Sequence, residues 1–217
     1  GRPIDLVIAS KFPTYCVRHP NKVAWLVHQH REAYDLLGTP YSNLSETEAD
    51  TDVRARLLSL DRDMLGECQQ LFTISRTASA RLERFNGIRA EALYPPPRLA
   101  TDLRPGSQGN YVLSVGRLEG NKRIDLVVGT MRDVVPPIRL VVVGEGSQRM
   151  DLERATEALD LGDRVDFVGW VDDDMLIDLY ANALAVVYPP YDEDYGYVTL
   201  EAFLARKPVL TTTDAGG

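Results

Sequence analysis

Short apolar runs alternate with amphipathic stretches along the whole of this 217-residue chain. Apolar runs bounded by turn residues are typical of buried strands, and apolar positions three or four apart are typical of helices. In the first half, the predicted strands are residues 4–10, 22–27, 71–74 and 91–94. The predicted helices there are 32–37, 45–70 with a break near Asp61 or Gly66, and 75–85, which Asn86-Gly87 should close as a C-cap.

Residues 95–110 interrupt this pattern, because they are rich in proline, glycine and polar residues and show no periodicity. We therefore predict a linker at 98–110. After it the predicted strands are 111–115, 138–143, 165–168, 184–188 and 208–210, and the predicted helices are 123–131, 150–161, 173–181 and 197–205. Strands that alternate with helices imply a parallel sheet covered on both faces. We expect an α/β protein with two parallel-sheet domains, 1–97 and 111–217.

Composition narrows the choice of partners and compartment. The formal net charge of −8 and the pI near 4.9 argue against nucleic acid or an anionic membrane as the main partner. Two cysteines, Cys16 and Cys68, do not suggest a disulfide scaffold, so a reduced, cytoplasmic setting is expected. No apolar run approaches the ~18 residues of a membrane span. The chain starts without Met and stops soon after an apolar run, which we interpret as a piece of a longer protein.

The most informative stretch is 184–210. An apolar run ends at two prolines, an acidic loop follows at 192–194, and Gly196 opens the amphipathic segment 197–205. The loop thus lies at the carboxyl end of a predicted strand, where open α/β sheets bind ligands. Gly196 permits close approach of a ligand, and the first helical amides, from Gly196 to Val198, favour an anion.

Glu193 in the loop and Glu201 in the helix flank this anion site. From Tyr197 to Glu201 the helix rises about 6 Å. A ligand with phosphate in the middle and hydroxyl groups at both ends, such as a nucleotide diphosphate sugar, suits the arrangement. The alternative is two solvated glutamates around a helix start, since glutamate is common on surfaces.

The residues around the two acids resemble a known signature. Glu193 to Gly196, followed after four residues by Glu201-Ala202, resembles the E-x-F-G-x4-E-A signature of retaining glycosyltransferases of family 4, the glycosyl transferases group 1, which have the GT-B fold. Tyr195 stands where that family usually has Phe. The resemblance covers nearly the whole chain and is stronger after residue 111.

A second segment resembles the V-G-R-L-x3-K-G motif of the same family: Val115-Gly116-Arg117-Leu118, then Lys122. In that family the Arg and the Lys bind the donor diphosphate, which matches the need of a departing diphosphate for cations. Arg123 replaces the usual glycine after the Lys, so the following helix is expected to start differently. The alternative interpretation is a solvated basic loop.

Two further segments are similar to parts of the family's donor site. The turn at Gly144-Glu145-Gly146 resembles a glycine turn near the nucleotide, although a tight strand-to-helix turn explains it as well. A dehydrogenase fingerprint is disfavoured, because Arg149 occupies the last glycine position. Residues 165–171 resemble the V-x-F-x-G segment beside the base, which implies base contacts from Val168 and Trp170. A lone tryptophan is more often a packing residue.

His28 and His30 follow the second predicted strand. They lack carboxylate or cysteine partners at metal-ligand spacing, so no metal site is expected. The family resemblance implies that a histidine at such a strand end faces the donor, with His28 favoured over His30. A satisfied structural histidine is the alternative.

The resemblance implies two Rossmann-like domains, the first one partial, and a retaining, metal-independent sugar transfer without a cofactor. It implies that Arg117 and Lys122 hold the diphosphate, that Glu193 contacts the sugar and that Glu201 contacts the ribose. The remaining implied donor contacts are Gly116, Gly144, Tyr195, Gly196, Tyr197 and Val198. The acceptor is an unidentified glycan, lipid or small molecule, with room for peripheral membrane contact of the parent enzyme. The alternatives are a non-catalytic nucleotide-sugar binding module, an inactive fragment and, less favoured, a glycoside hydrolase, which would use a carboxylate pair without Arg117 and Lys122.

Overall fold

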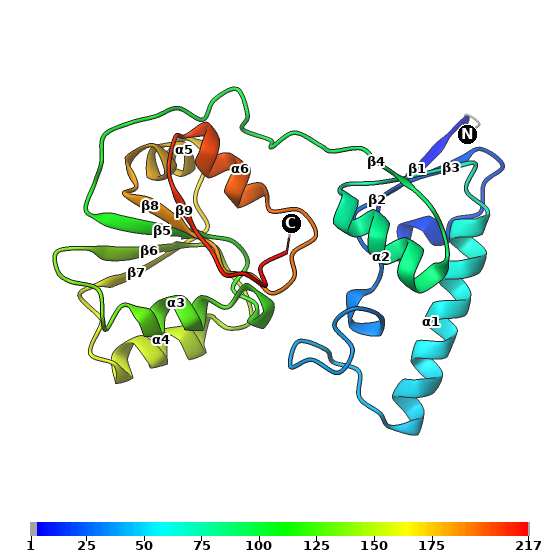
Figure 1. The fold of residues 1–217 in the computed structure, drawn as a ribbon, viewed down its shortest axis with the longest axis horizontal. Coiled ribbons are helices and arrows are strands. Elements are labelled where there is room, and N and C mark those ends of the chain that lie inside the picture. The colour runs from blue at the N-terminus through cyan, green and yellow to red at the C-terminus, as the bar shows by residue number, and fades with distance from the viewer. Residues whose placement is uncertain (1–3, 217) are drawn as a thin grey trace. The chain divides into compact units, whose positions relative to one another are not determined.

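The computed structural model describes residues 4–216 and divides them at Pro95–Pro96 into two compact units (Figure 1). Each unit is built around its own parallel sheet, and the two sheets are separate. The mixed α/β character with two parallel sheets confirms the predicted fold class.

The first unit carries a four-stranded parallel sheet in the order β1-β2-β3-β4. Its strands are β1 (Val7–Ala9), β2 (Lys22–Leu26), β3 (Gln70–Thr73) and β4 (Glu91–Ala92), and its helices are the 3₁₀ helices η1 (Thr14–Cys16) and η2 (Arg31–Ala33) and the α-helices α1 (Glu48–Gly66) and α2 (Arg76–Asn86). The core of this unit lies between the sheet and the long helices.

Capping side chains set the helix boundaries of the first unit. The Thr47 hydroxyl accepts a hydrogen bond from the Asp50 amide at the start of α1. The Ser75 hydroxyl does the same for the Ala78 amide at the start of α2. Gly87 then ends α2 in the left-handed conformation, with φ of 68°, which confirms the predicted C-cap.

One predicted element of the first unit is wrong, and the structure decides between two alternatives for another. Residues 32–37 are not an α-helix: η2 covers only Arg31–Ala33 and turns follow it. Of the two positions at which a break in the predicted 45–70 helix was expected, the structure has the one at Gly66, where α1 ends, and the helix runs unbroken through Asp61. The Asp61 carboxylate faces inward and accepts hydrogen bonds from the hydroxyl groups of Tyr15, at 2.7 Å, and Tyr34, at 2.6 Å. Because this buried side chain has hydrogen-bond partners in the core, the helix continues through Asp61 to Gly66.

The second unit carries a five-stranded parallel sheet in the order β7-β6-β5-β8-β9. Its elements are β5 (Tyr111–Val115), η3 (Gly120–Lys122), α3 (Ile124–Thr130), β6 (Arg139–Val143), α4 (Arg149–Ala158), β7 (Val165–Gly169), α5 (Asp173–Asn182), β8 (Ala185–Val187), α6 (Tyr197–Leu204) and β9 (Val209–Leu210). Figure 1 shows α3 and α4 on one face of this sheet and α5 and α6 on the other.

The side chains of β6 point alternately into the two hydrophobic cores of this unit, one on each face of the sheet. Leu140 and Val142 pack with α3 and α4, whereas Val141 and Val143 pack with α5 and α6. All four side chains are at most 5% exposed, because β6 is an interior strand that is buried on both faces, and its sequence is therefore a continuous apolar run. The prediction of helices on both faces is confirmed here.

The predicted linker at 98–110 is packed as part of the second unit. Leu99 and Leu103 are buried in the core beneath α5 and α6, so residues 96–110 belong to the second unit. Two leucines within an otherwise polar segment were the signal for this packing.

The strand order creates a crevice at one end of the second sheet. β5 pairs with β6 on one side and with β8 on the other. The chain leaves β5 through α3 towards β6, and it leaves β8 through α6 towards β9. The helices that follow these two strands, α3 and α6, therefore lie on opposite faces of the sheet (Figure 1), and such a switch point is where open α/β sheets bind ligands. Within residues 4–216, no helix combines the length and the apolar character needed to cross a bilayer.

Candidate functional site

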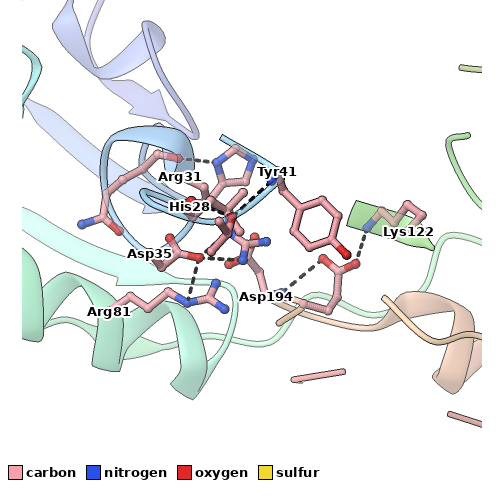
Figure 2. Close-up of polar contacts among 11 residues, drawn as sticks. His28, Arg31, Asp35, Tyr41, Arg81, Lys122 and Asp194 are labelled. Atoms are coloured by element: carbon pink, nitrogen blue, oxygen red, sulfur yellow. Dashed lines mark hydrogen bonds and ion pairs between the residues drawn. The ribbon is translucent and has the colours of Figure 1, made fainter. Parts of the chain in front are cut away.

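Lys122 and Glu193 meet at this switch point. Lys122 ends the loop after β5 and donates a hydrogen bond to the Glu193 carboxylate in the loop after β8. The other carboxylate oxygen accepts from the Asp194 amide at 3.1 Å, and Figure 2 shows both contacts. The Tyr188 hydroxyl donates to Glu193 Oε2 at 2.6 Å. Lys122 and Glu193 side chains are only 12% and 13% exposed, so the pair is largely removed from water.

The surroundings of Glu193 keep it ionised. Burial by itself raises the pKa of this carboxyl group, but the charge of Lys122 and the hydrogen bonds from Lys122, Tyr188 and the Asp194 amide outweigh it. The net pKa of Glu193 lies below its usual value. Burial and the neighbouring Glu193 charge raise the pKa of Tyr188, so its hydroxyl remains a proton donor. Glu193 is therefore a fixed acceptor for hydroxyl groups.

A pH dependence of stability follows from this pKa. A carboxyl group whose pKa is lowered in the folded state stabilises the fold above its unfolded pKa, about 4.3 for Glu, and loses that contribution as the pH falls through the folded value. We expect Glu193→Gln to reduce the free energy of unfolding by on the order of 1 kcal/mol at pH 7, and the difference from wild type to shrink below about pH 4. Urea unfolding of both proteins from pH 3 to 7 measures this. A difference that stays constant across that range would contradict the assignment.

Glu201 lies apart from this pair and has its own partner. It projects from α6, and its Oε2 accepts a hydrogen bond from the Tyr180 hydroxyl of α5 at 2.8 Å. Burial raises the pKa of Glu201, although Tyr180 and the charge of Arg98 act in the opposite direction. The two predicted acids thus sit in different environments, one matched by a cation and one mainly by a phenol. Sequence reasoning missed Tyr180 and Tyr188, because aromatic residues at core positions ordinarily indicate packing alone.

The start of α6 has no side-chain cap. Gly196 is the N-cap residue, and its carbonyl accepts from the Thr199 amide at 3.0 Å. Val198 is buried in the core, so its contribution to any ligand is limited to the backbone. The rings of Tyr195 and Tyr197 pack edge to face with centroids 4.7 Å apart. Position 195, where the resembled signature usually has Phe, thus also holds an aromatic ring in this chain.

Glycines end three adjacent strands, β5, β6 and β7. Gly116, Gly144 and Gly169 have φ values of 152°, 129° and 73°, a region that suits glycine. A Cβ atom on Gly144 would lie 1.9 Å from the Gly116 carbonyl oxygen, so the two loops touch through their backbones. Gly144 thus permits close packing of the two strand ends, and its contact with a donor stays a prediction.

An open pocket of about 590 Å³ lies at the same end of the sheet. Its lining includes Gly116 and Arg117 after β5, Gly144 after β6 and Trp170 after β7. Trp170 is 79% exposed, so its ring is not part of the core, whereas Val168 packs against the core. Arg117 lines this pocket, and its side chain is exposed.

Arg98, which sequence reasoning also missed, completes the wall of this pocket. Its guanidinium forms a two-pronged contact with the Asp173 carboxylate at the start of α5, with one bond of 2.6 Å. The structure therefore brings six of the predicted donor residues of the second unit into two sets: Lys122 with Glu193, and Arg117, Gly116, Gly144 and Trp170 around the pocket. Glu201 and the predicted residues at 195–198 belong to neither set.

His28 and His30 follow β2 in the first unit. Nδ1 of His28 contacts the Gln29 carbonyl, and because a carbonyl only accepts, Nδ1 carries the proton. In the neutral ring Nε2 is then an acceptor. His30 Nε2 lies 3.9 Å from Glu32 Oε2, and its ring packs on Phe12. Among residues 4–216, no three His, Cys, Asp or Glu side chains gather as a metal-binding group. The functional role of either histidine stays a prediction.

A nearby ion-pair cluster of the first unit was not expected. Arg31 donates to Asp35 Oδ2 at 2.6 Å, and Arg81 of α2 lies 3.6 Å from the same oxygen, so both arginines converge on Asp35 (Figure 2). The Asp35 side chain is 8% exposed. This cluster fixes the segment after β2 against α2, and the i,i+4 spacing of Arg31 and Asp35 was its only sequence signal.

Comparison with known proteins decides the family. The family model for glycosyl transferases group 1 matches residues 99–217. The chain belongs to this family. It is 25% identical to alpha-D-kanosaminyltransferase of Streptomyces kanamyceticus over 95% of this chain and 52% of that protein. It is 30% identical to D-inositol 3-phosphate glycosyltransferase of Mycobacteroides abscessus over 69% of this chain and 35% of that protein. The chain therefore spans about half, or less, of the length of these relatives.

Solved glycosyltransferase structures share the fold. Sucrose-phosphate synthase from Thermosynechococcus elongatus aligns with a TM-score of 0.77 at 22% identity, covering 98% of this chain and 56% of that one. Anabaena HepE in complex with UDP and glucose aligns with a TM-score of 0.67 at 18% identity, covering 90% of this chain and 59% of that one. These matches confirm the GT-B type of fold for this group 1 glycosyltransferase chain.

Proposed function

We propose that this group 1 glycosyltransferase chain carries the donor site of an enzyme that moves a sugar from a nucleotide diphosphate sugar to an acceptor hydroxyl with retention of configuration. The observation that carries the proposal is the Lys122–Glu193 pair at the switch point between β5 and β8. An ionised acceptor and a cation held side by side at this crevice suit a polyhydroxyl group joined to a diphosphate.

The donor parts are assigned by chemistry. Lys122 and the uncapped amides at the start of α6 suit the diphosphate, and exposed Arg117 supplies a second cation. Glu193, ionised and fixed by three donors, suits sugar hydroxyls. Glu201 suits the ribose, and exposed Trp170 offers a ring to the base on the pocket rim. Anabaena HepE, which shares the fold, binds UDP and glucose.

A glycoside hydrolase fits this site less well than a transferase does. A glycoside hydrolase acts through two carboxyl groups across one bond. Here Glu193 is matched by Lys122 and Glu201 by Tyr180, so the two acids are not built as a pair. A non-catalytic nucleotide-sugar binding module would use the same contacts, and turnover by the parent enzyme separates it from a transferase.

We assign the first unit to the acceptor side of that enzyme, and we place the enzyme in the cytoplasm.

Calorimetric titration tests the division of roles. We expect Glu201→Ala to weaken UDP and UDP-glucose, or GDP and GDP-mannose, alike by roughly 1–3 kcal/mol, the value of a hydrogen bond to a charged group. Glu193→Ala should spare the nucleotide diphosphate and weaken only the sugar nucleotide. EDTA should change neither titration, because we propose a metal-independent site.

Glu157→Ala provides the matched control, since Glu157 is an exposed glutamate of α4. If the Glu193 and Glu201 variants weaken both ligands equally, the acids are not divided between sugar and ribose. If neither variant differs from the Glu157 control, neither glutamate contacts the donor. Binding that disappears with EDTA and returns with Mg²⁺ or Mn²⁺ would refute the metal-independent assignment.

A further inference from the structure

Arg123 has a backbone conformation that is unusual for an arginine. It follows Lys122 directly, and its φ of 53° and ψ of 42° lie in the left-handed region. Residues with a side chain avoid this region, whereas glycine enters it freely. Glycine is also the residue that the resembled V-G-R-L-x3-K-G motif has at this position. The chain therefore keeps a backbone shape suited to glycine and adds a large charged side chain to it.

The Arg123 guanidinium joins two loops. Nε donates to the Pro189 carbonyl at 2.6 Å, and Nη2 donates to the Pro190 carbonyl at 2.7 Å, both in the loop after β8. Nη2 also contacts Thr212 Oγ1 at 2.7 Å, and the Asp214 carboxylate accepts from Nη2 and Nη1 at 2.7 and 2.9 Å. Thr212 and Asp214 belong to the segment after β9. The Arg123 side chain is only 14% exposed, so it is held between the loops.

Backbone hydrogen bonds also join the loop that carries Glu193 to the segment after β9. The Asp192 amide donates to the Asp214 carbonyl at 2.9 Å, and the Glu193 amide donates to the Ala215 carbonyl at 2.6 Å. The segment after β9 thus holds the backbone of the acidic loop, and Lys122 holds the Glu193 carboxylate. Arg123 fixes that segment and the start of the loop together. The planar guanidinium group donates hydrogen bonds to several acceptors in fixed directions. A lysine ammonium group does not reproduce this geometry.

We propose that Arg123 is a positioning residue, which clamps the loop after β8 to the segment after β9 and so holds Glu193 in place for the sugar of the donor. This inference rests on the proposed function for the role of Glu193. The clamp itself is a property of the chain without ligand, so the two can be tested separately.

Hydrogen exchange tests the clamp in the absence of ligand. Arg123→Gly removes the guanidinium and leaves a residue that accepts φ of 53° without strain. We expect the Asp192 and Glu193 amides to exchange about tenfold faster or more in this variant, because their acceptors are then free to move, while amides of β5 and β6 keep their protection. Unchanged exchange at these two amides would overturn the proposal.

Ligand titration tests the positioning role. With UDP against UDP-glucose and GDP against GDP-mannose as probes, we expect Arg123→Gly to lose about tenfold in affinity for the sugar nucleotide and to stay within about twofold for the nucleotide diphosphate. Arg123→Lys, which restores the charge but not the fork, should resemble Arg123→Gly. Equal losses for both kinds of ligand, no loss at all, or full rescue by lysine would overturn the positioning role.

Arg164 offers a matched control in the same unit. It donates to the carbonyls of Met131, Val134 and Ile138 at 3.0, 2.7 and 3.0 Å, at the amino end of the sheet and away from the switch point. Arg164→Ala should leave the sugar-to-diphosphate affinity ratio unchanged. A similar drop of that ratio in Arg164→Ala would assign the Arg123 effect to general loosening and overturn the proposal. If the wild-type chain binds none of the four probes, the proposed function fails and the positioning role with it, while exchange still decides whether the clamp exists.

Discussion

Lys122→Ala is expected to weaken UDP, GDP and the corresponding sugar nucleotides alike, and to slow the parent enzyme by on the order of 10²–10³-fold. The reason is that charge builds up on the diphosphate as the bond to the sugar breaks, so a fixed cation stabilises the transition state more than the bound donor. Titration calorimetry measures the binding loss, and initial rates of the parent enzyme measure the catalytic one. Retention of wild-type affinity for all four ligands would contradict the diphosphate assignment.

The same substitution has a second effect that needs its own control. Without Lys122, the Glu193 carboxylate keeps its hydrogen bonds from Tyr188 and from the Asp194 amide but has no cation beside it. A largely buried carboxylate without a matching cation destabilises the fold. The double variant Lys122→Ala with Glu193→Gln removes that unmatched charge. We expect it to recover much of the lost stability in urea unfolding, but none of the affinity for nucleotide diphosphate. Recovery of affinity would mean that Lys122 acts only through Glu193.

Gly144→Ala is expected to destabilise the second unit by at least about 3 kcal/mol. The added Cβ would lie 1.9 Å from the Gly116 carbonyl oxygen, and this neighbour is backbone that a rotamer change does not move. The φ of 129° at Gly144 adds conformational strain for any residue with a side chain. Urea or thermal unfolding measures the effect, which should also loosen the loop that carries Arg117.

Gly129→Ala is the matched control for that variant. Gly129 lies inside α3, and a Cβ atom there would meet no heavy atom within 4 Å. Because alanine favours helix more than glycine does, this change should be neutral or stabilising by about 0.5–1 kcal/mol. Equal losses of stability at both positions would contradict the prediction that the close approach of Gly144 to Gly116 excludes a side chain at residue 144.

Under the proposed function, a long donor would contact both sets of residues. The Lys122–Glu193 pair is nearly buried and already neutralised, so it offers one ionised acceptor and one cation without a large change of fold. The pocket with Arg117 and Trp170 is open, and these side chains remain exposed at its rim. A donor that reaches from one set to the other would use the rigid pair at its sugar end and the open pocket at its nucleotide end.

Periodicity predicted the second unit closely and the first less well. In the second unit every predicted strand and helix is present, because apolar runs such as 138–143 sit in a sheet buried on both faces. In the first unit three of the four strands are shorter than predicted, with β1 reduced to Val7–Ala9, and 32–37 forms mainly turns instead of a helix. The Arg31–Asp35–Arg81 cluster shapes that segment, and a contact to α2 from fifty residues away leaves no local pattern.

The sequence by itself determined the α/β alternation, the break near Pro95 and the loop positions of Lys122, Glu193 and Gly196, because strand runs, turn residues and helix starts are local signals. Only the tertiary structure decided that Lys122 binds Glu193, that Tyr180 and Tyr188 bind the two acids and that Arg123 bridges two loops. Each of these contacts depends on the strand order, which brings the ends of β5, β8 and β9 together although β5 and β9 lie nearly a hundred residues apart in the chain. Side chains at such ends meet through the sheet and not through their spacing, so their partners follow from the fold alone.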